Sequence, residues 1–136
     1  MLNFVEVVIT EWALNSYLEL VADGAFSRDE YKETIRPDVE RLKDHPNDVK
    51  FGQGKFWSVA TDSLGQTIAD GYKMKWHNMG NGRVNIRLPV AMLHEAVLCE
   101  AYVKNDPKKE KRRLARFKTH VQLVRQGRYT TRGRLP

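Results

Sequence analysis

Five side chains that carry or can carry positive charge lie close together in the middle of the sequence. Lys73, Lys75 and His77 alternate with apolar residues, and this period of two places them on one face of a β-strand. Arg83 and Arg87 alternate in the same way in the next segment. No acidic residue interrupts either alternation, and a face of one sign can bind an anion. The same pattern also fits a solvated sheet face on which lysine and arginine prevent aggregation.

The two lysines of this set could supply a base. Two residues on one face of a strand are about 7 Å apart, and a like charge at that distance lowers the pKa of a lysine. The guanidinium of Arg83 would stay charged and could hold a phosphate through two hydrogen bonds. His77 could act as an acid, although a single histidine on a solvated face is more often inert.

The remaining histidines and the cysteine do not form a metal site. His45, His94 and His120 are not paired with carboxylates at the spacing of metal ligands. The single cysteine, Cys99, excludes an internal disulfide and a zinc site built from several thiolates. We therefore expect no metal and no cofactor. Such sparse cysteine use is typical of a reducing compartment, so a cytoplasmic location is expected.

A three-stranded antiparallel meander over residues 72–104 would position these side chains. Residues 79–82 have the composition that a tight hairpin needs after the first strand. The second strand has an apolar face formed by Val84, Ile86 and Leu88. The third strand is expected over residues 96–104, and residues 89–95 before it are expected to form a helical turn or a partner contact.

The segment before the meander is expected to contain a strand and two helices. Residues 2–9 fit an edge or central strand; this run is too short to span a bilayer and lacks a basic leader, so no membrane association is expected. Thr10 is a good N-cap for the first helix. Ser27 and Glu30 form a capping box for a second helix, which Pro37 must kink or split.

The C-terminal part is expected to form a basic helix and a mobile tail. Asp106 can cap a helix that begins at Pro107 and stops before Gly127. Its apolar residues form one stripe that would pack on the sheet: Leu114, Phe117, Val121 and Val124. Residues 128–136 are expected to be a mobile cationic tail. The sequence thus predicts one α+β domain over residues 1–127, with a small antiparallel-rich sheet, an N-terminal helical hairpin and a basic C-terminal helix.

Positive charge is concentrated at the end of the chain. Residues 104–136 contain twelve Lys or Arg and two acidic residues, whereas the net charge of the whole chain is +6. A basic end on a mildly acidic body indicates a polyanionic partner, most often nucleic acid. An acidic partner protein would fit the same charge.

Several of these features together resemble the RelE/ParE superfamily of bacterial toxins, and especially a phage-type RelE-like branch. One is the order of the expected elements: a strand, two helices, a meander and a basic helix. Another is the motif Tyr72-Lys73-Met74-Lys75 followed by Arg83. A third is the junction of the last strand with the basic helix, Tyr102-Val103-Lys104-Asn105-Asp106-Pro107-Lys108-Lys109-Glu110. The similarity covers most of the chain, and it is best from Tyr72 onward.

The resemblance implies the toxin of a type II toxin–antitoxin pair. In RelE-like members this toxin is a metal-independent endoribonuclease, an mRNA interferase that cleaves messenger RNA on the ribosome and so inhibits translation. By position, Lys73, Lys75 and Arg83 would be catalytic. The cations expected to bind RNA are His77, Arg87, Lys104, Lys108, Lys109, Arg112 and Arg113. The implied partners are an acidic antitoxin protein, the ribosome and messenger RNA.

The chain departs from the family pattern in its last helix. Phe117 and Lys118 stand where some members have a tyrosine, and Tyr102 is only a weak substitute for it. RNA cleavage by its own 2′-hydroxyl needs a base, cations for the charge on the phosphate and an acid for the leaving oxygen. Two other interpretations stay open: a ParE-like toxin of the same fold that inhibits DNA gyrase, and a non-catalytic basic module that binds nucleic acid or a partner protein.

Overall fold

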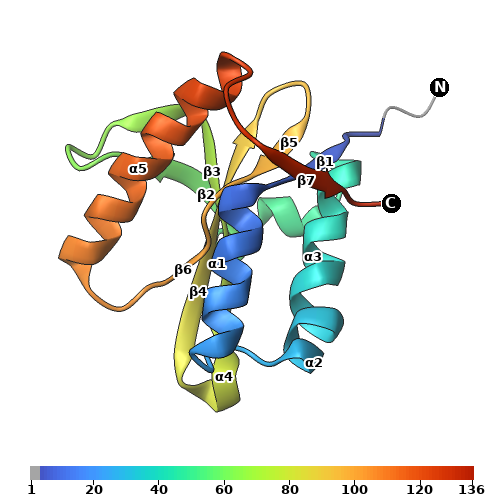
Figure 1. Cartoon of the computed structure of the whole chain (residues 1–136), viewed down its shortest axis with the longest axis vertical. Coiled ribbons are helices and arrows are strands. Elements are labelled where there is room, and N and C mark those ends of the chain that lie inside the picture. The colour runs from blue at the N-terminus through green and yellow to red at the C-terminus, as the bar shows by residue number, and fades with distance from the viewer. Residues whose placement is uncertain (1–3) are drawn as a thin grey trace.

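A computed structural model describes residues 4–136, and within them seven strands form one sheet (Figure 1). The strands are β1 (Val7–Thr10), β2 (Trp57–Thr61), β3 (Thr67–Asn78), β4 (Val84–Met92), β5 (Ala96–Leu98), β6 (Tyr102–Val103) and β7 (Thr131–Arg134). They lie in the order β2, β3, β4, β5, β1, β7, and β6 also pairs with β4. The pair of β1 and β5 is parallel, and the other pairs in the described chain are antiparallel. The chain is therefore an α+β protein with a mostly antiparallel sheet, as the sequence predicts.

The meander is present, but its strands differ in length from those expected. β3 begins at Thr67, before the predicted start, and β4 continues to Met92. The prediction of a helical turn over residues 89–95 is wrong, because Val90 and Met92 continue the alternation of the strand and Pro89 accepts a hydrogen bond from Cys99. The predicted third strand is divided into β5 and β6, which both pair with β4.

The strand that precedes the helices lies inside the sheet, between β5 and β7. Its expected start at Leu2 lies outside the described residues. Thr10 ends β1 and caps α1 (Glu11–Ala22), since its hydroxyl accepts a hydrogen bond from the amide of Ala13 at 3.1 Å. The same hydroxyl donates to the carbonyl of Leu98 at 2.6 Å. One side chain therefore fixes both the start of the helix and its position on the sheet.

The second helical segment runs antiparallel to α1 and changes its pitch three times (Figure 1). It consists of α2 (Arg28–Glu30), a π-helical turn (Tyr31–Ile35), α3 (Arg36–Glu40) and a 3-10 turn (Arg41–Asp44). The predicted capping box of Ser27 and Glu30 is present. The pattern changes directly before Pro37, where the amide of Arg36 bonds to the carbonyl of Tyr31. A wider turn at this place accommodates a ring that cannot follow an ordinary helix.

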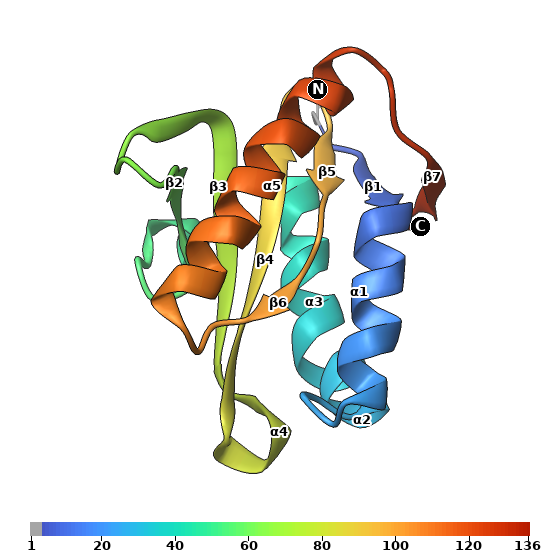
Figure 2. The ribbon, with the colours of Figure 1, turned by 60° about the vertical axis from the view of Figure 1, so that its left-hand side comes forward.

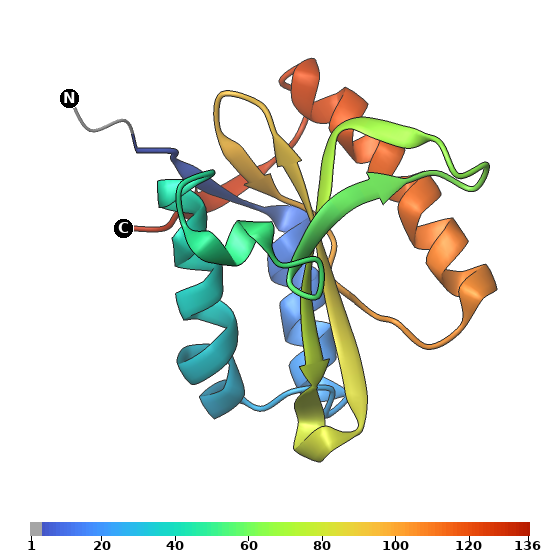
Figure 3. The same cartoon turned by 180° about the vertical axis from the view of Figure 1, so that it is seen from behind.

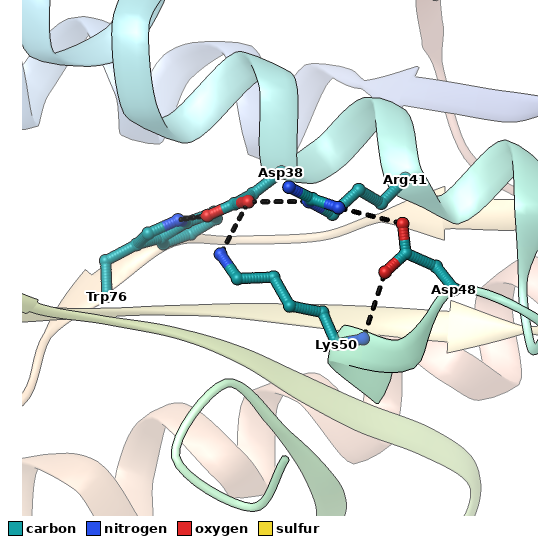
Figure 4. Close-up of polar contacts among 5 residues, drawn as sticks. All are labelled: Asp38, Arg41, Asp48, Lys50 and Trp76. Atoms are coloured by element: carbon teal, nitrogen blue, oxygen red, sulfur yellow. Dashed lines mark hydrogen bonds and ion pairs between the residues drawn. The ribbon is translucent and has the colours of Figure 1, made fainter. Parts of the chain in front are cut away.

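A buried carboxylate attaches this helical segment to the sheet (Figure 4). Asp38 accepts hydrogen bonds from the indole of Trp76 on β3 at 2.9 Å and from Lys50 at 2.8 Å. Arg41 donates to Asp38 at 3.0 Å and to Asp48 at 2.8 Å. Because a buried polar group is costly when unpaired, these contacts favour the packing of the helical hairpin against β3.

The predicted basic helix is α5 (Pro107–Arg125), capped by Asp106, whose carboxylate accepts from the amide of Lys108 at 2.9 Å. Its predicted apolar stripe is buried. The prediction of a mobile tail is wrong for residues 131–134, which form β7 against β1. Arg134 bonds to Glu95 at 2.6 Å and Arg132 to Glu11 at 2.9 Å. Partners that lie far away in the sequence give this segment its structure, so local composition did not reveal it.

The helices lie on opposite faces of the sheet (Figures 2 and 3). The helical hairpin covers the face that carries Met74, Trp76 and Leu88, and α5 crosses the other face over Ala91 and Val97. In Figure 2 the β3–β4 hairpin extends beyond α5 toward the short turn α4 (Met79–Gly82), so this half of the face is not covered by that helix. In the described chain, no helix has both the length and the apolar composition needed to cross a membrane.

Candidate functional site

Four side chains meet on the sheet face where the cover of α5 ends. The register pairs Lys75 of β3 with Arg87 of β4, and Arg87 with Tyr102 of β6. Lys73 lies two residues along β3 on the same face. Both lysines are half-buried, whereas Arg87 and Tyr102 are buried, with 5% and 2% of their surface exposed. We call Lys73, Lys75, Arg87 and Tyr102 the sheet site.

Arg87 is a buried cation whose donors are mostly unused. Within residues 4–136 its guanidinium donates from Nη1 to the carbonyl of Ile86 at 3.3 Å, and its buried Nε has no partner. None of the salt bridges of the described residues includes it. Burial lowers the pKa of this guanidinium, and the nearby charge of Glu110 opposes that effect. Since a buried charge without a counter-ion is costly, an anion bound here would be strongly stabilised.

Both lysines of the sheet site are easier to deprotonate than a lysine in water. Burial is the main cause of the lowered pKa of Lys73, and the charges of Arg87 and Lys104 add to it. Burial also lowers the pKa of Lys75, followed by the charges of Lys73 and Arg87. The sequence predicted the effect of like charges but not the larger effect of burial. Lys75 donates a hydrogen bond of 2.8 Å to the carbonyl of Gly54.

A carboxylate from α5 completes the site. The hydroxyl of Tyr102 donates to Glu110 at 2.7 Å. Burial raises the pKa of Tyr102, as do its hydrogen bond to Glu110 and the charge of that carboxylate, so the phenol keeps its proton. Glu110 could not be singled out from the sequence, because it is one acid in a run of bases. Tyr102 and Glu110 are eight positions apart in the sequence, a spacing that indicates no contact until β6 and α5 are placed side by side.

Arg83 is not part of this group. It lies exposed after α4, where its amide bonds to the carbonyl of Met79 at 2.9 Å. It precedes the first residue of β4 and lies four positions before Arg87, so roughly 10–13 Å of chain separates the two arginines. Arg87, expected only to bind RNA, is the arginine that the register brings to the two lysines.

The other residues predicted to bind RNA lie on β3, directly after β6 and on α5. His77 is exposed at the far end of β3, and its Nε2 lies 2.8 Å from the carbonyl of Lys55. Lys104 is exposed, and it lies close enough to the two lysines for its charge to lower the pKa of each. Lys108 is exposed in the first turn of α5.

Further along α5, basic side chains line a surface hollow of about 260 Å³: Lys109, Arg112, Arg113 and Arg116. Glu100 bonds to Arg113 at 3.1 Å and to Arg116 at 2.8 Å. The hollow is therefore partly neutralised from within the chain. The sheet site and this hollow together present cations from β3 to the middle of α5.

The sheet site combines the groups that phosphodiester cleavage needs. A lysine with a lowered pKa can take a proton, a guanidinium can hold the phosphate, and a protonated phenol can donate. Within residues 4–136 no three His, Cys, Asp or Glu side chains lie together as metal ligands would. The side chains of the sheet site and Glu110 offer the chemistry of lysine, arginine, tyrosine and one carboxylate.

Comparisons with known proteins add no relative to this description. No protein-family model, no curated protein and no solved structure matches the chain.

Proposed function

We propose that this chain is the toxin of a bacterial type II toxin–antitoxin pair of the RelE/ParE kind, and that it cleaves messenger RNA on the ribosome. The observation that carries the proposal is Arg87, a buried guanidinium with a free Nε beside two lysines of lowered pKa. A surface that only needs solubility would expose its arginines or pair them with acids. A site that binds a phosphate gains from a buried arginine whose donors are not paired with an acid of the protein.

The order of the elements supports the same proposal. A strand, a helical hairpin, a meander and a basic helix follow one another as the resemblance to RelE/ParE toxins leads us to expect. The short strand β6 brings the junction at Lys104 beside β4, where the amide of Lys104 donates to the carbonyl of Asn85 at 2.9 Å. The basic α5 then extends the positive surface along which an RNA backbone could lie.

In the proposed reaction the RNA supplies its own nucleophile. Lys75, as the neutral amine, takes the proton of a 2′-hydroxyl, and the 2′-oxygen attacks the neighbouring phosphorus. Arg87 and Lys73 hold the non-bridging oxygens as negative charge develops on them. Tyr102 donates its proton to the 5′-oxygen, which leaves as a hydroxyl. The products are a 2′,3′-cyclic phosphate and a 5′-hydroxyl end, and Glu110 orients the phenol.

The proposed partners follow from the charge and from the reaction. The ribosome presents the messenger RNA, and so the toxin would act in the cytoplasm. An antitoxin that covers a surface with so many unpaired cations would be acidic. No metal ion and no cofactor takes part in this scheme.

Induction of the protein alone in bacteria tests the proposal. We expect growth to stop, protein synthesis to fall before DNA replication, and primer extension to show new 5′ ends within translated messages. Lys75→Ala should remove these ends, while Lys32→Ala, on an exposed helix surface far from the sheet site, should not.

Other outcomes of the same experiment would favour the other interpretations. If replication and the DNA-damage response change first, the chain acts as a gyrase inhibitor. Unchanged growth would favour a non-catalytic binding module and would contradict the proposal.

A further inference from the structure

A polar cleft of about 280 Å³ lies beside the sheet site, between the C-terminal half of α1 and the start of α5. Figure 1 shows the segment after β6 leading from the side of α1 to the first turn of α5. The residue directly before β6 is held against α1, because the amide of Ala101 donates to the hydroxyl of Ser16 at 3.0 Å. Tyr102 of the sheet site also lines the cleft, so the two sites share a wall.

The two helices present opposite charges to this cleft. Glu19 and Asp23 come from the last turn of α1 and its C-cap, and Lys109 and Arg113 come from the first two turns of α5. Glu19, Asp23 and Lys109 lie at helix ends where the dipole of their own helix disfavours their charge, and Arg113 lies one turn further into α5. Acids at a C-terminus and bases at an N-terminus weaken both helices, so their placement is not explained by helix stability.

In the described chain, the acids of α1 form no salt bridge with the bases of α5. Among residues 4–136 neither Glu19 nor Asp23 takes part in a salt bridge, and the same holds for Lys109. Arg113 bonds to Glu100, which also lines the cleft. The cleft therefore offers acceptors on one wall and cationic donors on the other. A fitting ligand has an anionic group at one end and hydrogen-bond donors at the other.

We propose that this cleft binds a guanine nucleotide of the RNA, next to the phosphate at the sheet site. The phosphate of this nucleotide would contact Lys109 and Arg113, and its base would donate to Glu19 or Asp23. A carboxylate only accepts hydrogen bonds. Guanine presents two adjacent donors, N1–H and the 2-amino group, whereas adenine and cytosine place a ring acceptor beside their amino group. The single N–H of uracil lies between two carbonyls, which a carboxylate repels.

This inference rests on the proposed function for its choice of ligand, and it is tested without any cleavage. Guanosine and adenosine 5′-monophosphate, which have no phosphodiester bond to cut, are titrated into the full chain, and amide chemical shifts are followed by NMR. We expect the guanine nucleotide to bind about tenfold more tightly, since one bidentate contact to a base discriminates by about 5- to 150-fold. The shifts should centre on residues that line the cleft.

Variants then test the acidic residues of α1 and the basic residues of α5 separately. Asp23→Asn and Glu19→Gln together should remove the preference for guanine but leave some binding, while Lys109→Ala should weaken both nucleotides alike. Matched controls are Asp29→Asn on α2 and Lys111→Ala on α5, which do not line the cleft and should change nothing. Equal binding of the two nucleotides to the unaltered protein would overturn the inference, and so would a guanine preference that survives the double variant. A preference found in a chain that cuts no RNA would leave this inference standing and would contradict the proposed function alone.

Discussion

The hydroxyl of Tyr102 donates a 2.7 Å hydrogen bond to Glu110 and thereby joins β6 to the first turn of α5. The bond places a carboxylate at the edge of a group of cations, where its charge raises the pKa of Lys73 and of Arg87 against the effect of burial. Glu110 therefore reaches the sheet site only because α5 packs on the sheet.

The pH dependence of cleavage tests the role of Lys75 as the base. Lys73 lowers the pKa of Lys75, so its removal should raise that pKa and move the rising limb of the pH–rate profile to higher pH. Lys73→Met is the suitable variant, because methionine keeps the apolar stem that helps to bury Lys75. Rates would be measured across the alkaline range, with Lys111→Met as the control. A profile that falls in amplitude but keeps its midpoint would show that Lys75 is not the titrating base.

The buried network at Asp38 should contribute measurably to stability. Asp38→Asn removes the charge that Lys50 and Arg41 share, so we expect the free energy of unfolding to fall by about 1–3 kcal/mol. Urea denaturation would measure this. Glu33→Gln changes an exposed acid of the same helical segment and should stay within about 0.5 kcal/mol of the unaltered chain. Equal effects would mean that the network adds no stability.

Two glycines of the α4 turn differ in what surrounds them. Gly80 has φ +58° and a Cβ there would meet the carbonyl oxygen of Ala25 at 2.6 Å, whereas Gly82 has φ +83° and nothing within 4 Å. Gly82→Ala should cost about 1 kcal/mol from backbone strain alone. Gly80→Ala should cost more than about 2 kcal/mol, since it also displaces the turn from the helical hairpin and from Glu30, which accepts from the Gly80 amide at 3.0 Å. Thermal unfolding of both variants would show whether this contact matters.

Mild acid should destabilise the fold through two histidines. His120 stacks on Trp12 with ring centroids 3.8 Å apart, its Nδ1 is buried without a partner in the described chain, and burial lowers its pKa; burial also lowers that of His45. Well above pH 6.5, the usual pKa of histidine, the two imidazoles are neutral in both the folded and the unfolded chain, so they cause no loss of stability. As the pH falls below it, the unfolded chain binds protons that the folded chain resists, so stability decreases.

The variant His120→Phe removes one of the two titrating imidazoles. It keeps an aromatic ring against Trp12, and so the free energy of unfolding should depend less steeply on pH between about 6.5 and 5. The carboxylates Asp48 and Asp62 have a lowered pKa in the fold and respond only near and below their usual 3.8, outside this window. An unchanged slope would contradict the buried, neutral state of His120.

Features set by neighbours in the sequence were predictable, and features set by distant partners were not. The caps at Thr10, Ser27 and Asp106 depend on residues within one turn of a helix, and each is present. The pairing of β7 with β1 depends on Glu6 and Glu95, more than thirty residues from their common partner Arg134, so no local pattern predicted it.

The candidate site shows the same division. The alternation of Lys73 and Lys75 predicted that they share a face, and they do. Which arginine joins them depends on the register of β3 against β4, and a strand that extends to Met92 places Arg87 there in place of Arg83. Alternation alone gave both arginines the same face and could not choose between them. Burial of Arg87 was also beyond the sequence, because it depends on how β6 and the start of α5 cover the strand.

The assignment of Arg87 to the cleavage site is tested by comparing how fast Arg87→Gln and Arg83→Gln cleave messenger RNA on translating ribosomes. Both substitutions remove one positive charge, and circular dichroism would establish that both chains fold. We expect Arg87→Gln to cut at least about a hundredfold more slowly, the usual loss for one preorganised donor, and Arg83→Gln to keep most of the activity. Loss of activity in Arg83→Gln with full activity in Arg87→Gln would contradict the assignment of the sheet site.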